Sequence, residues 1–207
     1  MARASLTRRR LLGLDRSGPP PPQTLPGAPL NPWTIPNAIG YVRVALVPVF
    51  LVLALGSGDG RLASASAIFA VIGGTDYLDG MTARVTGQYS RLGTLLDPLV
   101  DRLLVLSGVV VTYHFHLLPR WALIVLAARE LLMLVFTRVG MKRGIDLNVN
   151  MVGRWAVWPT MFSIFLAMLS TTWVAPALLY LGLAMTLWAT ALYLRDGYRA
   201  LQSNTQA

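Results

Sequence analysis

The sequence contains no cysteine, which excludes disulfide bonds and thiol chemistry. Charged residues are also scarce: they make up 13% of the 207 residues, whereas a soluble domain carries about 25%. Hydrophobic residues account for 55% of the chain, and the mean hydropathy is +0.55. This is the composition of a membrane protein, and the length favours a single domain.

Acidic residues are the scarcer of the two charged classes, with nine Asp and Glu against 18 Lys and Arg, which gives a net charge of +9. A basic balance can indicate a nucleic-acid partner. Here, however, the basic residues lie mostly in short gaps between apolar runs. The enrichment of Lys and Arg in the cytoplasmic loops of membrane proteins explains this placement more simply, so we expect no nucleic-acid partner.

Six apolar runs follow one another along the chain, and each is near the ~20 residues that a helix needs to cross a bilayer. We place them at residues 36–56, 62–86, 90–113, 120–139, 149–170 and 173–194. Basic gaps alternate with gaps of little positive charge, which predicts that both termini and the turn after the second run are cytoplasmic. The sequence therefore predicts an all-α, multi-pass protein of the cell membrane with six transmembrane helices.

The ends of the chain differ from this pattern. Residues 1–33 are rich in Arg and Pro without apolar periodicity, and we expect a disordered tail there. Residues 34–200 would form the membrane domain, and residues 201–207 a short C-terminal tail.

Charged residues inside the predicted spans are costly and are candidates for function. With a rise of about 1.5 Å per residue, Asp76 and Asp97 each lie roughly 10 Å from the cytoplasmic face. Arg43 and Arg154 reach a similar level, and Arg129 lies roughly 15 Å from the same face. We therefore expect the six helices to surround one polar cavity that opens to the cytoplasm and contains the active site.

Four aspartates lie within this region, namely Asp76, Asp79, Asp97 and Asp101. The first two are three residues apart and the last two are four apart, so each pair lies on one face of a helix. Four carboxylates facing one another in a low dielectric require cations. Ligands that are all oxygen favour Mg²⁺ or Mn²⁺, and two such ions can hold both phosphates of a pyrophosphate donor.

The aspartates belong to a longer pattern, which reads Asp76-x2-Asp79-Gly80-x2-Ala83-Arg84-x8-Gly93-x3-Asp97-x3-Asp101. This pattern resembles the signature of the CDP-alcohol phosphatidyltransferases, without departure at any of its fixed positions. The resemblance covers about residues 34–200. It implies an integral membrane enzyme of phospholipid biosynthesis that transfers the phosphatidyl group of CDP-diacylglycerol to an alcohol and releases CMP.

The resemblance also implies roles for individual residues. The general base would be Asp101, and two Mg²⁺ or Mn²⁺ ions would be held by Asp76, Asp79, Asp97 and Asp101. The residues alone do not divide these roles among the four aspartates. Binding of CDP-diacylglycerol would involve Pro36, Asn37, Ala38, Gly80, Ala83, Arg84, Ser90 and Gly93.

Each of these binding assignments has a structural alternative. Pro36 and Asn37 are also typical of a helix start, with Asn as the cap. The two glycines, Gly80 and Gly93, also suit tight helix packing, and Arg84 also suits a topology signal.

Three arginines remain for the acceptor, because guanidinium groups suit phosphate. We predict that Arg43, Arg129 and Arg154 bind an anionic glycerol-based acceptor. The alternative is that Arg129 pairs with Glu130 or an aspartate, while Arg154 extends to the membrane surface.

Within the family, the opening Ile35-Pro36-Asn37, Arg43 and the run Ala128-Arg129-Glu130 resemble the bacterial phosphatidylglycerophosphate synthase branch. That branch typically shows Gly-Lys-x-Lys-Thr where this chain has Gly153-Arg154-Trp155-Ala156-Val157, so the second basic residue and the Thr are missing. A cardiolipin synthase of the same family, which uses phosphatidylglycerol, tolerates this departure better.

The charges favour glycerol 3-phosphate as the acceptor, slightly ahead of phosphatidylglycerol. A cation transporter is the alternative from a different class, because intramembrane carboxylates also mark ion paths. A cation path does not require Gly80, Ala83, Arg84 and Gly93 at their offsets, which disfavours the transporter. The expected partners are CDP-diacylglycerol, the acceptor and membrane lipids, with a homodimer left open.

Overall fold

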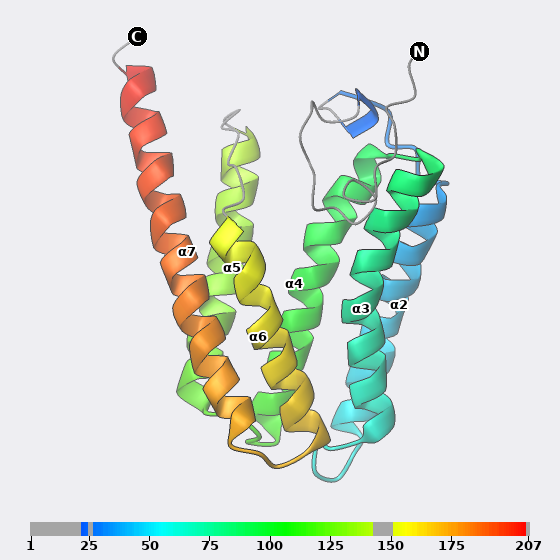
Figure 1. The fold of residues 1–207 in the computed structure, drawn as a ribbon, viewed down its shortest axis with the longest axis vertical. Helices are drawn as coiled ribbons and strands as arrows, with labels where there is room; N and C mark the ends of the chain where they lie inside the picture. The colour runs from blue at the N-terminus through cyan, green and yellow to red at the C-terminus, as the bar shows by residue number, and fades with distance from the viewer. Residues whose placement is uncertain (1–21, 25–26, 143–150, 206–207) are drawn as a thin grey trace. The chain divides into compact units, whose positions relative to one another are not determined.

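The computed structural model describes residues 22–24, 27–142 and 151–205, except for the side chains of residues 77, 79, 84, 136–142, 151–154 and 196–205. Within this part of the chain there are one short 3-10 helix and six long α-helices, and no strand (Figure 1). The elements are η1 (Pro22–Thr24), α2 (Ile35–Leu55), α3 (Ala63–Thr86), α4 (Arg91–His114), α5 (Arg120–Lys142), α6 (Met151–Leu169) and α7 (Val174–Thr205).

The prediction of an all-α protein is confirmed, and each of the six apolar runs forms one helix. Only the last helix departs clearly from its predicted bounds, because α7 continues to Thr205 instead of ending near residue 194. Residues 195–205 contain Arg, Ala, Leu and Gln, which favour a helix even where the sequence is no longer apolar. The range 201–207, expected as a tail, therefore begins as helix. The predicted tail at residues 1–33 lies largely outside the described residues.

Within the described residues, two helices are long and apolar enough to cross a membrane, namely α2 over Ile35–Leu55 and α7 over Val174–Arg195, with hydropathies of 2.3 and 1.7. A third apolar stretch, Trp155–Leu169 of α6, is shorter. Helices α3, α4 and α5 carry the four aspartates of the predicted site together with Arg84 and Arg129, which lower their hydropathy. Six transmembrane spans thus remain a prediction.

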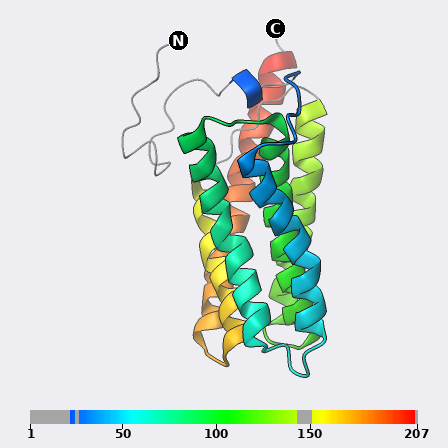
Figure 2. The same cartoon turned by 90° about the vertical axis from the view of Figure 1, so that its right-hand side faces the viewer.

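The chain divides into two compact units. The first contains the described residues up to Val52 together with Ala67–Leu104, so it holds most of α2 and α3 and the first half of α4. These segments run side by side (Figure 2). In their interior the rings of Phe50 and Phe69 meet with centroids 5.4 Å apart, and Ile72 of α3 is fully buried as well.

The second unit contains Leu53–Ser66 and the described residues from Val105 onward. Helices α6 and α7 approach closely there, because a Cβ atom on Gly182 would lie 2.9 Å from the backbone nitrogen of Thr160. The indole of Trp121 on α5 stacks on the ring of Tyr180 on α7, with centroids 5.6 Å apart.

Candidate functional site

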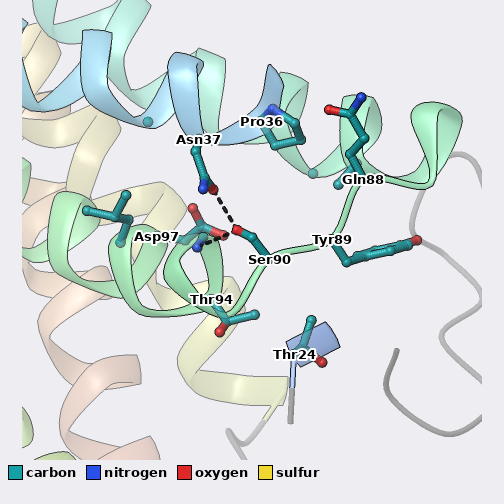
Figure 3. A pocket seen from close by; sticks show the side chains of 13 residues that line it. Thr24, Pro36, Asn37, Gln88, Tyr89, Ser90, Thr94 and Asp97 are labelled. Atoms are coloured by element: carbon teal, nitrogen blue, oxygen red, sulfur yellow. Dashed lines mark hydrogen bonds between the residues drawn. The ribbon is translucent and has the colours of Figure 1, made fainter. Parts of the chain in front are cut away.

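The starts of α2 and α4 are joined by the side chain of Asn37, which is 1% exposed. Its Nδ2 donates to the carbonyl oxygens of Asn31 at 3.0 Å and Pro32 at 3.1 Å. Its Oδ1 accepts from Ser90 Oγ at 2.8 Å, as Figure 3 shows. Asn37 therefore links the segment before α2 to the turn before α4.

Two hydroxyl side chains cap these helices. Thr34 Oγ1 accepts from the backbone N–H of Asn37 at 3.3 Å, and Ser90 Oγ accepts from that of Gly93 at 2.9 Å. Each is the bond from an N-cap to the third residue of its helix. The alternative in which Asn37 caps α2 is wrong, because Thr34 occupies that position.

Gly93 lies against the Asn37–Ser90 hydrogen bond. A Cβ atom on Gly93 would lie 2.9 Å from Asn37 Oδ1 and 3.1 Å from Ser90 Oγ. Cβ atoms are essentially never found within 3.0 Å of another heavy atom, so a side chain here would displace Asn37 Oδ1 from its hydrogen bond. The packing around Asn37 is therefore a structural reason for glycine at this position of the motif.

We expect Gly93→Ala to lower the free energy of unfolding by about 1–3 kcal/mol, as other overpacked sites do. Gly74→Ala is the matched control, because Gly74 is also helical and a Cβ atom there would have nothing within 4 Å. That control should be neutral or stabilising by up to about 1 kcal/mol, since Ala favours a helix over Gly. Thermal unfolding in detergent measures both variants. Equal stability of the two would contradict the packing argument.

A pocket opens beside this link (Figure 3). Six of the eight residues predicted to bind CDP-diacylglycerol line it, namely Pro36, Asn37, Gly80, Ala83, Ser90 and Gly93. Asp97 of the motif also lines it. Ala38 is exposed on α2 and is not among the lining residues, and the side chain of Arg84 lies outside the described residues.

The sequence did not single out several other lining residues, of which Gln88 and Tyr89 are in the turn between α3 and α4. Gln88 Oε1 accepts from the backbone N–H of Ile35 at 3.0 Å, which adds a second link between this turn and the start of α2. Gly87, with φ +69°, begins the turn. The position of both side chains between the two halves of the motif is the signal that could have found them.

The side chain of Arg43 on α2 connects two of the motif's aspartates. Its Nη1 donates to Asp76 Oδ1 on α3 and its Nη2 to Asp101 Oδ1 on α4, each at 3.0 Å. Arg43 is 1% exposed, whereas the side chains of Asp76 and Asp101 are 44% and 41% exposed. Two carboxylates from different helices thus meet at one buried cation while staying accessible to a ligand.

These carboxylate oxygens fit a hard divalent cation. A carboxylate has about four lone-pair sites, so it can accept a hydrogen bond from Arg43 and coordinate an ion at the same time. Among the described side chains, however, no three Asp, Glu or His form a group that could hold a metal, and the Asp79 side chain is not one of those described. The predicted site at Asp76, Asp79, Asp97 and Asp101 therefore stays a prediction.

Arg129 on α5 belongs to the second unit and is paired there. Its Nη1 forms an ion pair with Glu130, and its Nε donates to Thr190 Oγ1 at 3.0 Å. This is the alternative that the sequence left open, in which Arg129 pairs with Glu130. Arg154 lies on α6, and its side chain is outside the described part.

Comparison with known proteins relates most of the chain to one family. Residues 33–188 match the model of the CDP-alcohol phosphatidyltransferase family. The chain is 39% identical over 166 residues to the cardiolipin synthase (CMP-forming) of Streptomyces coelicolor, covering 77% of each chain. It is 30% identical over 144 residues to the CDP-diacylglycerol–glycerol-3-phosphate 3-phosphatidyltransferase of Bacillus subtilis, covering 64% of this chain and 75% of that one.

Proposed function

The chain belongs to the CDP-alcohol phosphatidyltransferase family, and from that premise we propose that it transfers the phosphatidyl group of CDP-diacylglycerol to phosphatidylglycerol. The products would be cardiolipin and CMP. The family places the chain among the enzymes of phospholipid biosynthesis, and it favours this activity over cation transport.

The pocket at the start of α4 supports binding of the nucleotide part of the donor. It is lined by small residues of the motif, including Gly80 and Ala83, which leave room for a ligand close to the backbone. Asp97 in its lining relates the pocket to the aspartates of the motif. A diphosphate bound here would lie beside oxygen ligands suited to Mg²⁺ or Mn²⁺.

The reaction needs a base and a way to stabilise the leaving group. We assign the base to Asp101, which would accept the proton of the acceptor hydroxyl as its oxygen attacks the phosphatidyl phosphorus. The bond from that phosphorus to the CMP oxygen breaks. One or two divalent ions, held by Asp76, Asp79, Asp97 and Asp101, would neutralise charge on the two phosphates. Members of the family generally depend on a divalent metal.

The choice of phosphatidylglycerol rests mainly on how the arginines are paired. A phosphate monoester such as glycerol 3-phosphate carries a charge of about −1.5 to −2, and three free arginines would suit it. Arg43 instead bonds Asp76 and Asp101, and Arg129 pairs with Glu130. Fewer unmatched cations favour a phosphodiester acceptor, which carries a single negative charge.

Ala156 supports the same choice, because it stands where the phosphatidylglycerophosphate synthase branch has its second basic residue. It is 0% exposed, so this position is packed inside the protein. Glycerol 3-phosphate remains the second candidate, favoured by the similarity to the Bacillus subtilis enzyme.

The acceptor is tested with purified protein, CDP-diacylglycerol and Mg²⁺, to which phosphatidylglycerol or glycerol 3-phosphate is added. Mass spectrometry of the lipids and release of CMP measure the reaction. We expect cardiolipin to form at least about tenfold faster than phosphatidylglycerophosphate. Conversion of glycerol 3-phosphate without any cardiolipin would reverse the choice of acceptor, and release of no CMP with either would overturn the transferase itself.

We propose six spans with both termini and the site on the cytoplasmic side of the cell membrane. The six helices contain 19 to 32 residues, or about 28 Å and more, close to the thickness of a bilayer core. Reporter fusions at Ala207 and at Ser170 should report opposite sides, with Ala207 in the cytoplasm. Fusions that report the same side would contradict this topology.

A further inference from the structure

Arg43 is a buried cation that donates hydrogen bonds to three acceptors on α3 and α4. Besides the two carboxylates, its Nε donates to the carbonyl oxygen of Ile72 at 3.0 Å. Ile72 and Asp76 are one turn apart on α3, so both are reached from the same side of that helix. The third acceptor, Asp101, comes from α4. The guanidinium of Arg43 thus holds α3 and α4 at fixed positions relative to α2.

The two carboxylates need this cation when no other is bound. Asp76 and Asp101 would repel each other without a cation between them, and a buried guanidinium without anionic partners would be costly. The planar fork of an arginine also fixes the direction of both carboxylates, which a lysine cannot do. Arg43 therefore sets both the charge and the geometry of this pair.

We infer that Arg43 is a positioning residue that orients the Asp76 and Asp101 carboxylates for a divalent ion and does not contact the acceptor. The inference rests on the proposed function, because it takes these aspartates as ligands of the ion. An acceptor phosphate could reach Arg43 only by displacing a carboxylate, since the side chain is 1% exposed. The role differs from the acceptor binding that the sequence predicted for Arg43.

This role predicts an unusual combination of effects for Arg43→Gln. The glutamine amide still offers two N–H donors but lacks the positive charge, which otherwise repels a divalent ion at the carboxylates. We expect Mn²⁺ to bind about tenfold more tightly. Turnover should fall by about 100-fold, because the ligands are no longer held in one orientation. The KM for the acceptor should stay within threefold of the wild type.

Arg43→Lys separates charge from geometry. It keeps the positive charge, so we expect the Mn²⁺ affinity to stay within threefold of the wild type. It loses the fork that orients both carboxylates, so turnover should still fall, by about tenfold. If Arg43 only stabilised the fold, both variants would lower thermal stability. They would not differ from each other in Mn²⁺ affinity.

The experiment uses the full chain in detergent with CDP present, and measures free Mn²⁺ by electron paramagnetic resonance during a titration. Thermal unfolding checks that each variant folds, and steady-state kinetics gives kcat and the KM for phosphatidylglycerol. Arg120→Gln is the control, because it removes the same charge from the start of α5, where the guanidinium lies over the ring of Tyr113. It should leave the Mn²⁺ affinity unchanged.

Two results would overturn the inference: a Mn²⁺ affinity of Arg43→Gln that is weaker than that of the wild type or less than twofold tighter, or a tenfold rise in its acceptor KM. If Arg43→Gln does not fold, a tenfold rise in the acceptor KM of Arg43→Lys overturns it, and an unchanged KM with slower turnover supports it. Wild-type protein that binds no Mn²⁺ would overturn the metal site first, and the acceptor assay described above separates that failure from loss of the reaction.

Discussion

Asp101→Asn should lower kcat by about 1,000-fold, within the 10²–10⁴ range that general bases contribute. The amide keeps the size of the side chain but does not accept a proton from the acceptor hydroxyl. The variant also loses a negative charge that faces Arg43, whose Nη2 lies 3.0 Å from Asp101 Oδ1. Both changes act in the same direction, which makes this one of the largest effects expected from a single substitution.

The measurement is CMP release under saturating CDP-diacylglycerol and acceptor, with thermal unfolding as the check on folding. Asp59→Asn is the matched control, because Asp59 lies in the turn after α2, where its Oδ1 accepts from the backbone N–H of Arg61. It should keep turnover within about twofold. If Asp101→Asn retained near-normal turnover, another group would have to be the base.

The helices could be predicted from the sequence because apolar runs and charged gaps mark where a chain can enter and leave a bilayer. The end of α7 could not be predicted in this way, because the helix continues to Thr205. Hydropathy reports the part of a helix that lipid can cover, while helix formation also depends on propensity. Residues after Arg195 favour a helix, although they are not apolar enough to be covered by lipid.

The site could be predicted in part. The spacing of the motif put Asp76 and Asp101 on two helices, and in the structure both bond to Arg43. The bond itself was not predicted, because residue spacing gives the depth of a side chain but not the direction in which it points around the helix. An arginine at that depth could equally bind the acceptor substrate or form an ion pair with an aspartate.

The role of Asn37 shows a second limit of the sequence. Its position beside a proline suggested either a nucleotide contact or a cap. The cap is Thr34, three residues earlier, and Asn37 uses its side chain to join two segments about 50 residues apart, through Ser90. A link of this kind depends on the tertiary structure, so no local sequence pattern predicts it.

Removal of divalent metal should have the second large effect. We expect excess chelator to reduce transfer by at least about 100-fold, because the negative charge on two phosphates would no longer be neutralised by an ion. Added Mg²⁺ or Mn²⁺ should restore activity. Chelator already saturated with Mg²⁺ is the control, since it should not inhibit.

A second readout makes this prediction independent of activity. An ion that binds the folded protein and not the unfolded chain raises stability by an amount that grows with its concentration, about 2.7 kcal/mol at 100 times Kd. Mn²⁺ should therefore raise the unfolding temperature of the wild type but not of Asp76→Ala, which lacks one ligand. Transfer that continued in excess chelator, or equal stabilisation of both proteins by Mn²⁺, would contradict a metal site at these aspartates.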